Sequence, residues 1–152
     1  MPAIARRYVY VQFLLFIGYV VVPRGYEWAA PAWLSLAGAF LCPYGLILIG
    51  WAIWLLRRQL SPYPVPTANA RLLTSGPFRY LRHPIYTGIL LLLLGYALWS
   101  AHPGRLGVTI LLAILFWFKA AYEEAQLLRV FPEYAAYCRQ AGRLWPRWKA
   151  YR

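Results

Sequence analysis

The chain has 152 residues, of which 62% are hydrophobic and only 13% are charged. A soluble domain needs more polar surface than this, and a water-exposed helix would not tolerate apolar blocks as long as those found here. The composition therefore excludes an ordinary soluble globular protein, and the length favours one membrane domain over residues 1–152.

Four apolar blocks predict four transmembrane helices, so the expected fold class is an all-α integral membrane bundle. The predicted spans cover residues of about 8–22, 32–56, 85–100 and 106–122. The first is short for a span, and tilt or local thinning of the bilayer can absorb the difference. We interpret it as a retained helix rather than a cleaved signal peptide.

The second predicted span carries residues that are expected to shape its packing. Pro43 removes a backbone hydrogen bond and therefore predicts a kink near the middle of the helix. Gly38, Gly45 and Gly50 offer positions at which a neighbouring helix can approach closely, because glycine has no side chain.

Two polar segments adjoin the last two predicted spans. Residues 57–84 form a predicted loop in which prolines spaced two apart favour an extended backbone. The last span continues without a helix breaker, so this helix is expected to leave the membrane with Glu123 and Glu124 at its exit. The tail, 123–152, is predicted to be a cytosolic helical extension.

The distribution of positive charge predicts the orientation in the membrane. The net charge is +12, and fourteen of the sixteen Lys and Arg residues fall on one side if the N-terminus is cytosolic. Positive charge concentrates on the cytosolic side of membrane proteins, so both termini and the polar loop are predicted to be cytosolic, in an inner, plasma or endoplasmic-reticulum-type membrane. The charges lie beside apolar blocks, which favours anionic lipids as partners over nucleic acid.

Several common kinds of site are not signalled by this sequence. It contains neither a GxGxxG nor a GxxxxGK[ST] motif, so no familiar nucleotide-binding loop is predicted. The two histidines, His83 and His102, do not form a zinc motif, and the absence of Asp excludes a Ser/His/Asp triad. Cys42 and Cys138 belong to no cluster, so we expect neither a metal site nor a disulfide framework.

Polar residues nevertheless concentrate at one membrane face. Arg82 and His83 precede the third predicted span, and Glu123 and Glu124 leave the fourth. A short turn at His102 joins these two spans, so they are expected to be antiparallel neighbours whose cytosolic ends meet. Ionisable groups paired at a membrane boundary indicate a functional site.

At these residues the sequence resembles a known group of enzymes. The segment Gly76-Pro77-Phe78-Arg79-Tyr80-Leu81-Arg82-His83-Pro84-Ile85-Tyr86-Thr87-Gly88 resembles the RHPxYxG signature of the isoprenylcysteine carboxyl methyltransferase and phospholipid N-methyltransferase families. The second half of their pattern is similar to Glu123-Glu124, Leu127, Phe131, Tyr134, Tyr137 and Arg143-Leu144-Trp145-Pro146. The resemblance covers the C-terminal half of the chain. Two departures are Ala121, where the carboxyl methyltransferases carry an arginine, and Pro132, where a glycine is common.

The resemblance implies a membrane methyltransferase that uses S-adenosylmethionine on a lipophilic acceptor at the cytosolic face. The catalytic residues that it implies are His83, Arg82 and Glu124. The donor-binding residues that it implies are Arg82, His83, Pro84, Tyr86, Gly88, Tyr122, Glu123 and Glu124. The two glutamates suit the donor's ammonium or ribose, and Arg82 or His83 suits its carboxylate.

The remaining implied residues have narrower roles. Tyr86 or Tyr122 suits the sulfonium of the donor, because an aromatic ring attracts a cation. Gly88 would let the donor approach the third span closely. An amine acceptor would have to lose a proton, for which His83 is the candidate base.

Other interpretations of the same residues stay open. The Arg82-His83 turn could anchor a helix at lipid phosphates, and the glutamates could form a solvated helix exit with Lys119 paired to Glu123 four residues on. At the level of function, the alternatives are an NADPH-dependent reductase related to the sterol reductases and a non-catalytic protein that binds anionic lipid. The chemical nature of the acceptor (carboxylate, amine or thiol) and the oligomeric state are left open.

Overall fold

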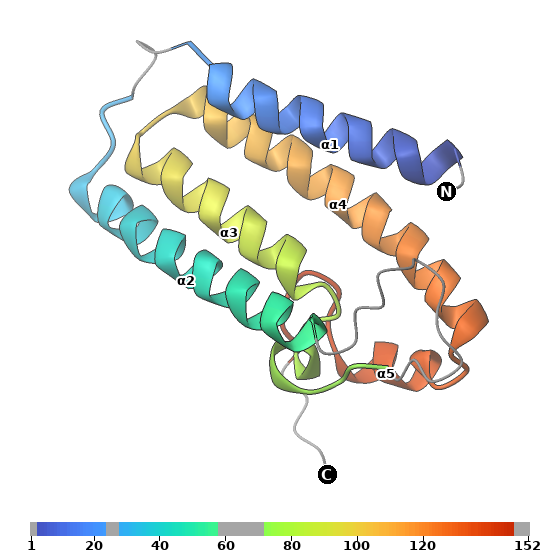
Figure 1. The fold of residues 1–152 in the computed structure, drawn as a ribbon. Coiled ribbons are helices and arrows are strands. Elements are labelled where there is room, and N and C mark those ends of the chain that lie inside the picture. Colours follow the sequence, from blue (N-terminus) through green and yellow to red (C-terminus); the bar gives the residue numbers. More distant parts are fainter. Residues whose placement is uncertain (1–2, 24–27, 58–71, 148–152) are drawn as a thin grey trace.

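The computed structural model describes residues 3–23, 28–57 and 72–147. Within these ranges the regular structure is helical, apart from an isolated β-bridge between Leu81 and Gly142. The helices are α1 (Ala3–Val21), α2 (Ala32–Leu56), the 3-10 helix η1 (Gly76–Arg79), α3 (Pro84–Trp99), α4 (Pro103–Val130) and α5 (Tyr134–Gln140). Figure 1 shows the long helices side by side, with α5 and η1 at the end of the bundle where α3 begins.

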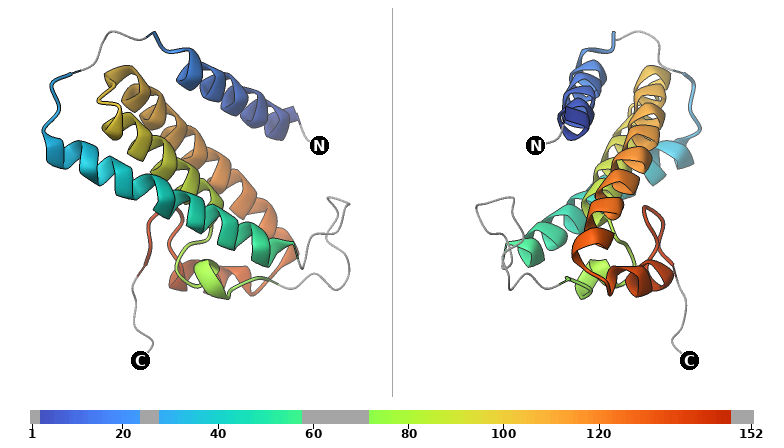
Figure 2. Two further views of the ribbon diagram at one scale, coloured as in Figure 1. Left: turned by 60° about the vertical axis from the view of Figure 1, so that its left-hand side comes forward. Right: turned by 90° about the vertical axis from the view of Figure 1, so that its right-hand side faces the viewer.

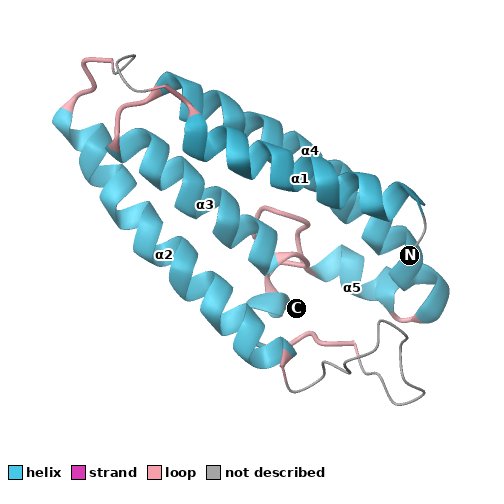
Figure 3. Ribbon diagram, turned by 45° about the horizontal axis from the view of Figure 1, so that its top comes forward, coloured by secondary structure: helices cyan, strands magenta, loops and turns pink. Residues whose placement is uncertain are grey.

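The membrane bundle predicted from the sequence is confirmed. Helices α1, α2 and α4 are long and apolar enough to cross a membrane, whereas α3 is apolar but has only 16 residues. At 1.5 Å per residue α3 is about 24 Å long, which is shorter than the hydrocarbon core of a bilayer. It lies between α2 and α4 in every view (Figures 1 and 3).

Helices α2 and α3 pack closely because glycines face each other across their contact. A Cβ atom added to Gly45 would lie 2.6 Å from the carbonyl oxygen of Gly88, and one added to Gly95 would lie 2.8 Å from that of Gly38. These two glycine pairs bring the helix backbones into direct contact, as small residues do in membrane helix pairs. Gly50 has open space around its Cα atom, so the expectation of close approach there is wrong.

The close contact between α2 and α3 makes a testable prediction about stability. We expect Gly45→Leu to separate the two helices, because the added side chain meets backbone atoms that cannot move aside, at a cost of about 1–3 kcal/mol. Gly50→Leu is the matched control, since the same side chain would enter open space. Thermal unfolding in detergent measures both variants. Equal midpoints for the two would contradict the packing described here.

The turn between α3 and α4 is tied to the ends of the first two helices. His102 is only 3% exposed, and its Nε2 atom donates a hydrogen bond to the carbonyl oxygen of Pro23 at 2.9 Å. The backbone N–H of Trp28 donates to the carbonyl of Ala101 at 3.0 Å. These bonds connect distant parts of the chain at the end of the bundle that lies opposite to α5 (Figure 2).

Helix α1 packs against α4 over an apolar core. Leu112 and Phe116 of α4 are fully buried, and Leu15 and Phe16 of α1 pack against them. Tyr19 of α1 donates its hydroxyl hydrogen to a backbone carbonyl of α3 at 2.5 Å. These contacts hold α1 beside the helix that carries the glutamate pair.

Candidate functional site

The Arg82-His83 turn is held in place by the C-terminal tail. Gly76 starts η1 with a φ of 60°, a left-handed conformation that favours glycine. After η1, the backbone N–H of Arg82 donates to the carbonyl of Gly142 at 2.7 Å, and that of His83 donates to Arg143 at 3.2 Å. The tail therefore runs alongside the turn and fixes the direction of its side chains just before Pro84 starts α3.

The buried carboxylate of Glu124 organises a cluster of charged side chains. We call Glu124, Arg82, His83 and Arg143 the Glu124 cluster. Glu124 is 5% exposed and accepts hydrogen bonds from Arg82 Nε at 2.8 Å and from Arg143 Nη2 at 2.8 Å. His83 Nε2 lies 3.2 Å from the same carboxylate. A buried charge is tolerated only when it is paired in this way.

Arg82 connects this cluster to the tail. Its Nη1 atom donates to the backbone carbonyls of Cys138 (2.9 Å) and Ala141. Burial alone would lower the pKa of the Arg82 guanidinium, but the hydrogen bond and charge of Glu124 raise it above its ordinary value. Arg82 therefore stays charged and bridges α4 to the segment that follows α5.

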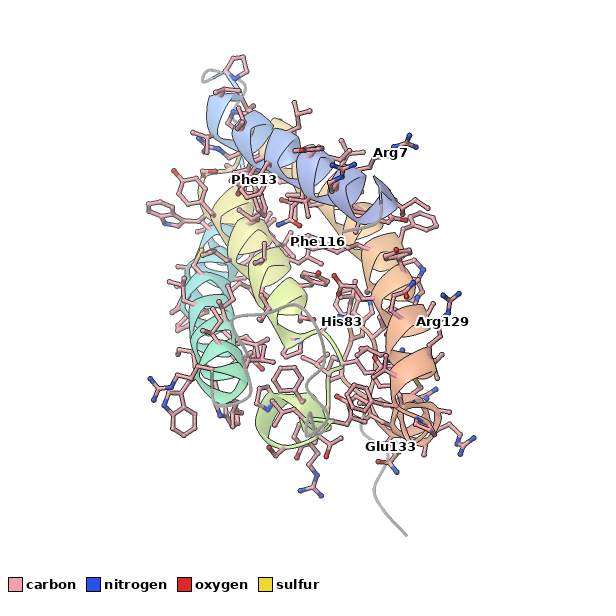
Figure 4. The ribbon with its side chains drawn as sticks, turned by 45° about the vertical axis from the view of Figure 1, so that its right-hand side comes forward. Arg7, Phe13, His83, Phe116, Arg129 and Glu133 are labelled. Carbon is pink, nitrogen blue, oxygen red and sulfur yellow. The ribbon has the colours of Figure 1, made fainter. Side chains whose placement is uncertain are left out.

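The second carboxylate, that of Glu123, has a different environment. Its side chain is 39% exposed, and it accepts a hydrogen bond from the hydroxyl of Tyr86 at 2.7 Å. His83 Nδ1 lies 3.6 Å from the other carboxylate oxygen. The Tyr86 ring is stacked against His83, with ring centroids 5.5 Å apart, and against Phe116 at 4.6 Å. Figure 4 shows His83 and Phe116 between α3 and α4.

Glu123 faces a small pocket at the end of the bundle, which we call the rim pocket. Its volume is about 190 Å³. It is lined by Leu56, Phe78, Arg82, His83, Pro84, Ile85, Tyr86 and Glu123. One exposed carboxylate, two cationic or polar side chains and an aromatic hydroxyl therefore converge on the same space. A ligand with both a cationic and an anionic group fits this combination.

A larger apolar groove runs between α3 and α4, away from the rim pocket. Its volume is about 540 Å³. It is lined by Thr87, Leu90, Leu91, Leu94, Leu106, Thr109, Ile110, Ala113, Ile114, Trp117, Phe118, Leu144 and Trp145. We call it the apolar groove. This lining favours a hydrocarbon chain over a polar ligand.

The apolar groove adjoins a basic pocket beneath the tail. This tail pocket has a volume of about 420 Å³. It is lined by Arg82, Trp117, Cys138, Gly142, Arg143, Leu144, Trp145, Pro146 and Arg147. It shares Trp117, Leu144 and Trp145 with the apolar groove, and it shares Arg82 with the rim pocket. Arg82 thus lies at the junction of the two polar pockets.

Most of the residues singled out from the sequence meet here. Arg82, His83, Tyr86 and Glu123 line the rim pocket with Pro84, and Glu124 lies directly behind them. Arg143 was not among the predicted site residues, although it belongs to the second half of the sequence pattern.

Two predicted donor-binding residues lie elsewhere. A Cβ atom on Gly88 would meet Ile49 Cγ1 at 2.6 Å, so the space into which its side chain would point is filled by α2, and Gly88 lines none of the three pockets. The ring of Tyr122 packs at a tilt of 45° against that of Tyr8 of α1, with centroids 6.0 Å apart, and lines none of the three pockets. Both residues therefore lie apart from the rim pocket.

The alternative interpretation, in which Lys119 pairs with Glu123 at a solvated helix exit, does not describe the contacts of these residues. In the described part of the chain His83 Nδ1 lies 3.6 Å from the Glu123 carboxylate, while Lys119 donates to Gln12 of α1 at 2.8 Å. Glu124 is thus buried within the protein, while the partly exposed Glu123 is bonded to Tyr86, so the two do not form an ordinary solvated helix exit.

Comparison with known proteins identifies related sequences and a related fold. A family model described as phospholipid methyltransferase matches residues 33–134, a segment that contains both Arg82-His83 and the glutamate pair. The cobalt-zinc-cadmium resistance protein CzcN of Cupriavidus metallidurans is 39% identical over 88 residues, which are 55% of this chain and 39% of that protein.

A solved structure shares the fold. The eukaryotic intramembrane Ras methyltransferase ICMT (isoprenylcysteine carboxyl methyltransferase) superposes with a TM-score of 0.66 at 22% identity. The match covers 97% of this chain and 53% of the ICMT chain. The chain thus spans about half or less of the length of these relatives. At this level of identity the likeness is one of fold, and it extends across almost all the helices described above.

Proposed function

Because this chain belongs to the phospholipid methyltransferase family, we propose that it transfers a methyl group from S-adenosylmethionine to a lipophilic acceptor at the cytosolic face of a membrane. The observation that carries the proposal is the convergence of Glu123, Tyr86 and His83 on one pocket at the end of apolar helices. A polar donor and an apolar acceptor can both reach this boundary.

The rim pocket suits the chemistry of the donor. S-adenosylmethionine carries an ammonium, a carboxylate, a sulfonium and a ribose diol. The exposed carboxylate of Glu123 can accept hydrogen bonds from the ammonium or the ribose, and Arg82 or His83 on the pocket wall can donate to the carboxylate. The 190 Å³ of the pocket is less than a ligand of this size fills, so we propose that it holds the amino-acid end of the donor.

The two glutamates have separate roles in this proposal. Glu123 contacts the donor, because it is partly exposed and faces the rim pocket. Glu124 is a positioning residue, because its carboxylate is buried and already accepts hydrogen bonds from two arginines. It fixes the Arg82-His83 turn, and thereby the wall against which the donor binds.

The aromatic residues of the site orient these groups. The stacked rings of His83 and Phe116 hold Tyr86, whose hydroxyl in turn orients Glu123. When bound, S-adenosylmethionine supplies an electrophilic methyl carbon, and transfer forms a bond from the acceptor to this carbon while the carbon–sulfur bond breaks. Most of the rate is expected from orientation and exclusion of water. His83 can take a proton where the acceptor is an amine.

We propose that the apolar groove holds the hydrocarbon chain of the acceptor. Its lining is almost entirely apolar, and its end at Leu144 and Trp145 adjoins the tail pocket that contains Arg82. An acceptor could therefore keep its chain between α3 and α4 and its head at the polar rim.

The groove assignment predicts the effect of blocking it. We expect Ala113→Trp to fill the groove and lower methyl transfer about tenfold or more, while leaving donor affinity unchanged, because an indole occupies much of the space that a chain needs. Leu111→Trp is the matched control, since Leu111 is 53% exposed on the same helix and does not line the groove. Equal activity in the two variants would exclude the groove as the acceptor site.

Direct binding tests the proposed function. Calorimetric titration of the purified chain with S-adenosylmethionine is expected to show one binding site, and absence of binding at millimolar donor would refute the proposal. A radiolabelled methyl-transfer assay against a panel of lipids and prenyl compounds would then identify the acceptor. Protection from thermal unfolding by NADPH, but not by S-adenosylhomocysteine, would instead indicate a reductase. Stabilisation by anionic lipid alone would indicate a non-catalytic role.

A further inference from the structure

Helix α1 lies outside the segment that matches the family model, yet it reaches the candidate site. The match begins at residue 33, whereas α1 ends at Val21. Figures 1 and 3 show α1 alongside α4. At the site end of this contact, Lys119 Nζ of α4 donates a hydrogen bond to Gln12 Oε1 of α1 at 2.8 Å. Family likeness assigns no role to this contact.

Lys119 bonds to Gln12 although Glu123, a possible ion-pair partner, lies four residues further along the same helix. Lys119 and Glu123 are four apart on α4, so their side chains share one helix face, where opposite charges ordinarily pair. Instead, the Lys119 ammonium lies 5.0 Å from the centroid of the Tyr86 ring and is bonded to Gln12. The charges of Lys119 and Glu123 still interact at longer range, but in the described part of the chain the short contacts of the Glu123 carboxylate are those to Tyr86 and His83.

The side-chain oxygen of Gln12 is a hydrogen-bond acceptor for the Lys119 ammonium, which would otherwise be available to pair with Glu123. A lysine partly buried at the edge of an apolar helix bundle needs acceptors for its hydrogen atoms. The amide oxygen of Gln12 provides one, and the face of the Tyr86 ring provides a second attraction for the positive charge. Lys119 is thereby held by a hydrogen bond to α1 and by a ring contact with α3.

We infer that Gln12 is a positioning residue that holds the Lys119 ammonium out of a direct ion pair with Glu123, so that the donor does not compete with Lys119 for this carboxylate, an inference that rests on the proposed function. Without the Gln12 oxygen, the nearest anionic partner along α4 for the Lys119 ammonium is Glu123. A Lys119–Glu123 pair would neutralise the carboxylate and compete with the ammonium of S-adenosylmethionine for the same oxygens. Helix α1 then contributes Gln12 to the site as a residue that positions Lys119.

The test is a double-mutant cycle read by donor binding. Calorimetric titration with S-adenosylmethionine is applied to the full chain in detergent and to the variants Gln12→Leu, Lys119→Met and their combination. Gln12→Leu is expected to weaken binding about threefold to tenfold, which is the range for one lost or competing hydrogen bond. In the Lys119→Met background the same change is expected to have no effect, because the competing cation is absent.

Two further variants separate positioning from a general loosening of α1. Gln12→Glu keeps an acceptor for Lys119 and is expected to restore wild-type affinity. Leu14→Ala, at an exposed position of the same helix, is expected to leave affinity unchanged. An equal loss of affinity from Gln12→Leu in both Lys119 backgrounds would overturn the inference, as would wild-type affinity in Gln12→Leu alone. Failure of the wild-type chain to bind the donor would refute the proposed function, and the inference with it.

Discussion

Glu124→Gln is expected to destabilise the chain and to abolish donor binding together. The substitution keeps the shape of the side chain but removes the negative charge that Arg82 and Arg143 share. Two guanidinium groups would then face each other without a counterion in a largely buried place. Breaking a buried ion pair by removing one partner costs about 3–5 kcal/mol. The Arg82-His83 turn, which forms the wall of the rim pocket, would lose its anchor on α4.

Thermal unfolding and calorimetric donor titration measure the two effects separately. Glu133→Gln is the matched control, because Glu133 is an exposed carboxylate near the same end of the bundle and lies outside the Glu124 cluster. We expect this control to unfold and to bind donor like the wild type. A Glu124→Gln variant with wild-type stability would mean that the cluster does not hold the turn in place.

The membrane helices and the meeting of the two motifs could be predicted from the sequence. Long apolar blocks specify spans with little dependence on context, because the bilayer requires each backbone to satisfy its own hydrogen bonds. A short turn between two such helices makes them antiparallel neighbours, which brings His83 close to the glutamate pair. These steps use local pattern and chain connectivity alone.

The different environments of the two glutamates, with Glu124 buried against two arginines and Glu123 partly exposed, could not be predicted in this way. It depends on the tail folding back to the turn through the bridge between Leu81 and Gly142, which delivers Arg143 to Glu124. No periodic pattern in residues 123–152 encodes that return. The sequence therefore favoured Glu124 as a donor ligand, whereas the structure shows its carboxylate already bonded to two arginines.

The sequence also did not show which face of each apolar helix packs against a neighbouring helix. Helix α3 is apolar on all sides, so its sequence does not distinguish the face that meets α2 from the face that meets a ligand. The sequence therefore allows Gly88 to be a point of donor approach, whereas in the structure it contacts Gly45 and Ile49 of α2. For the same reason the sequence did not predict that α1 packs against α4, nor the contact between Gln12 and Lys119.

Glu123→Gln is expected to weaken donor binding without destabilising the fold, whereas Glu124→Gln is expected to do both. The amide oxygen of Gln can still accept the hydrogen bond from Tyr86, so the local geometry is preserved. Only the negative charge is lost. A hydrogen bond to a charged group contributes about 1.5–3 kcal/mol, which corresponds to about a tenfold to hundredfold loss of affinity for S-adenosylmethionine.

Tyr86→Phe sharpens this comparison, because it removes the hydroxyl that orients Glu123 and leaves the charge in place. Since orientation is lost and attraction is kept, we expect a smaller loss of donor affinity than in Glu123→Gln. Thermal unfolding of both variants should match the wild type, which separates a binding role from a structural one. If Glu123→Gln binds the donor as tightly as the wild type does, the donor site lies outside the rim pocket. The tail pocket, with Arg143 and Arg147, would then be the next place to test.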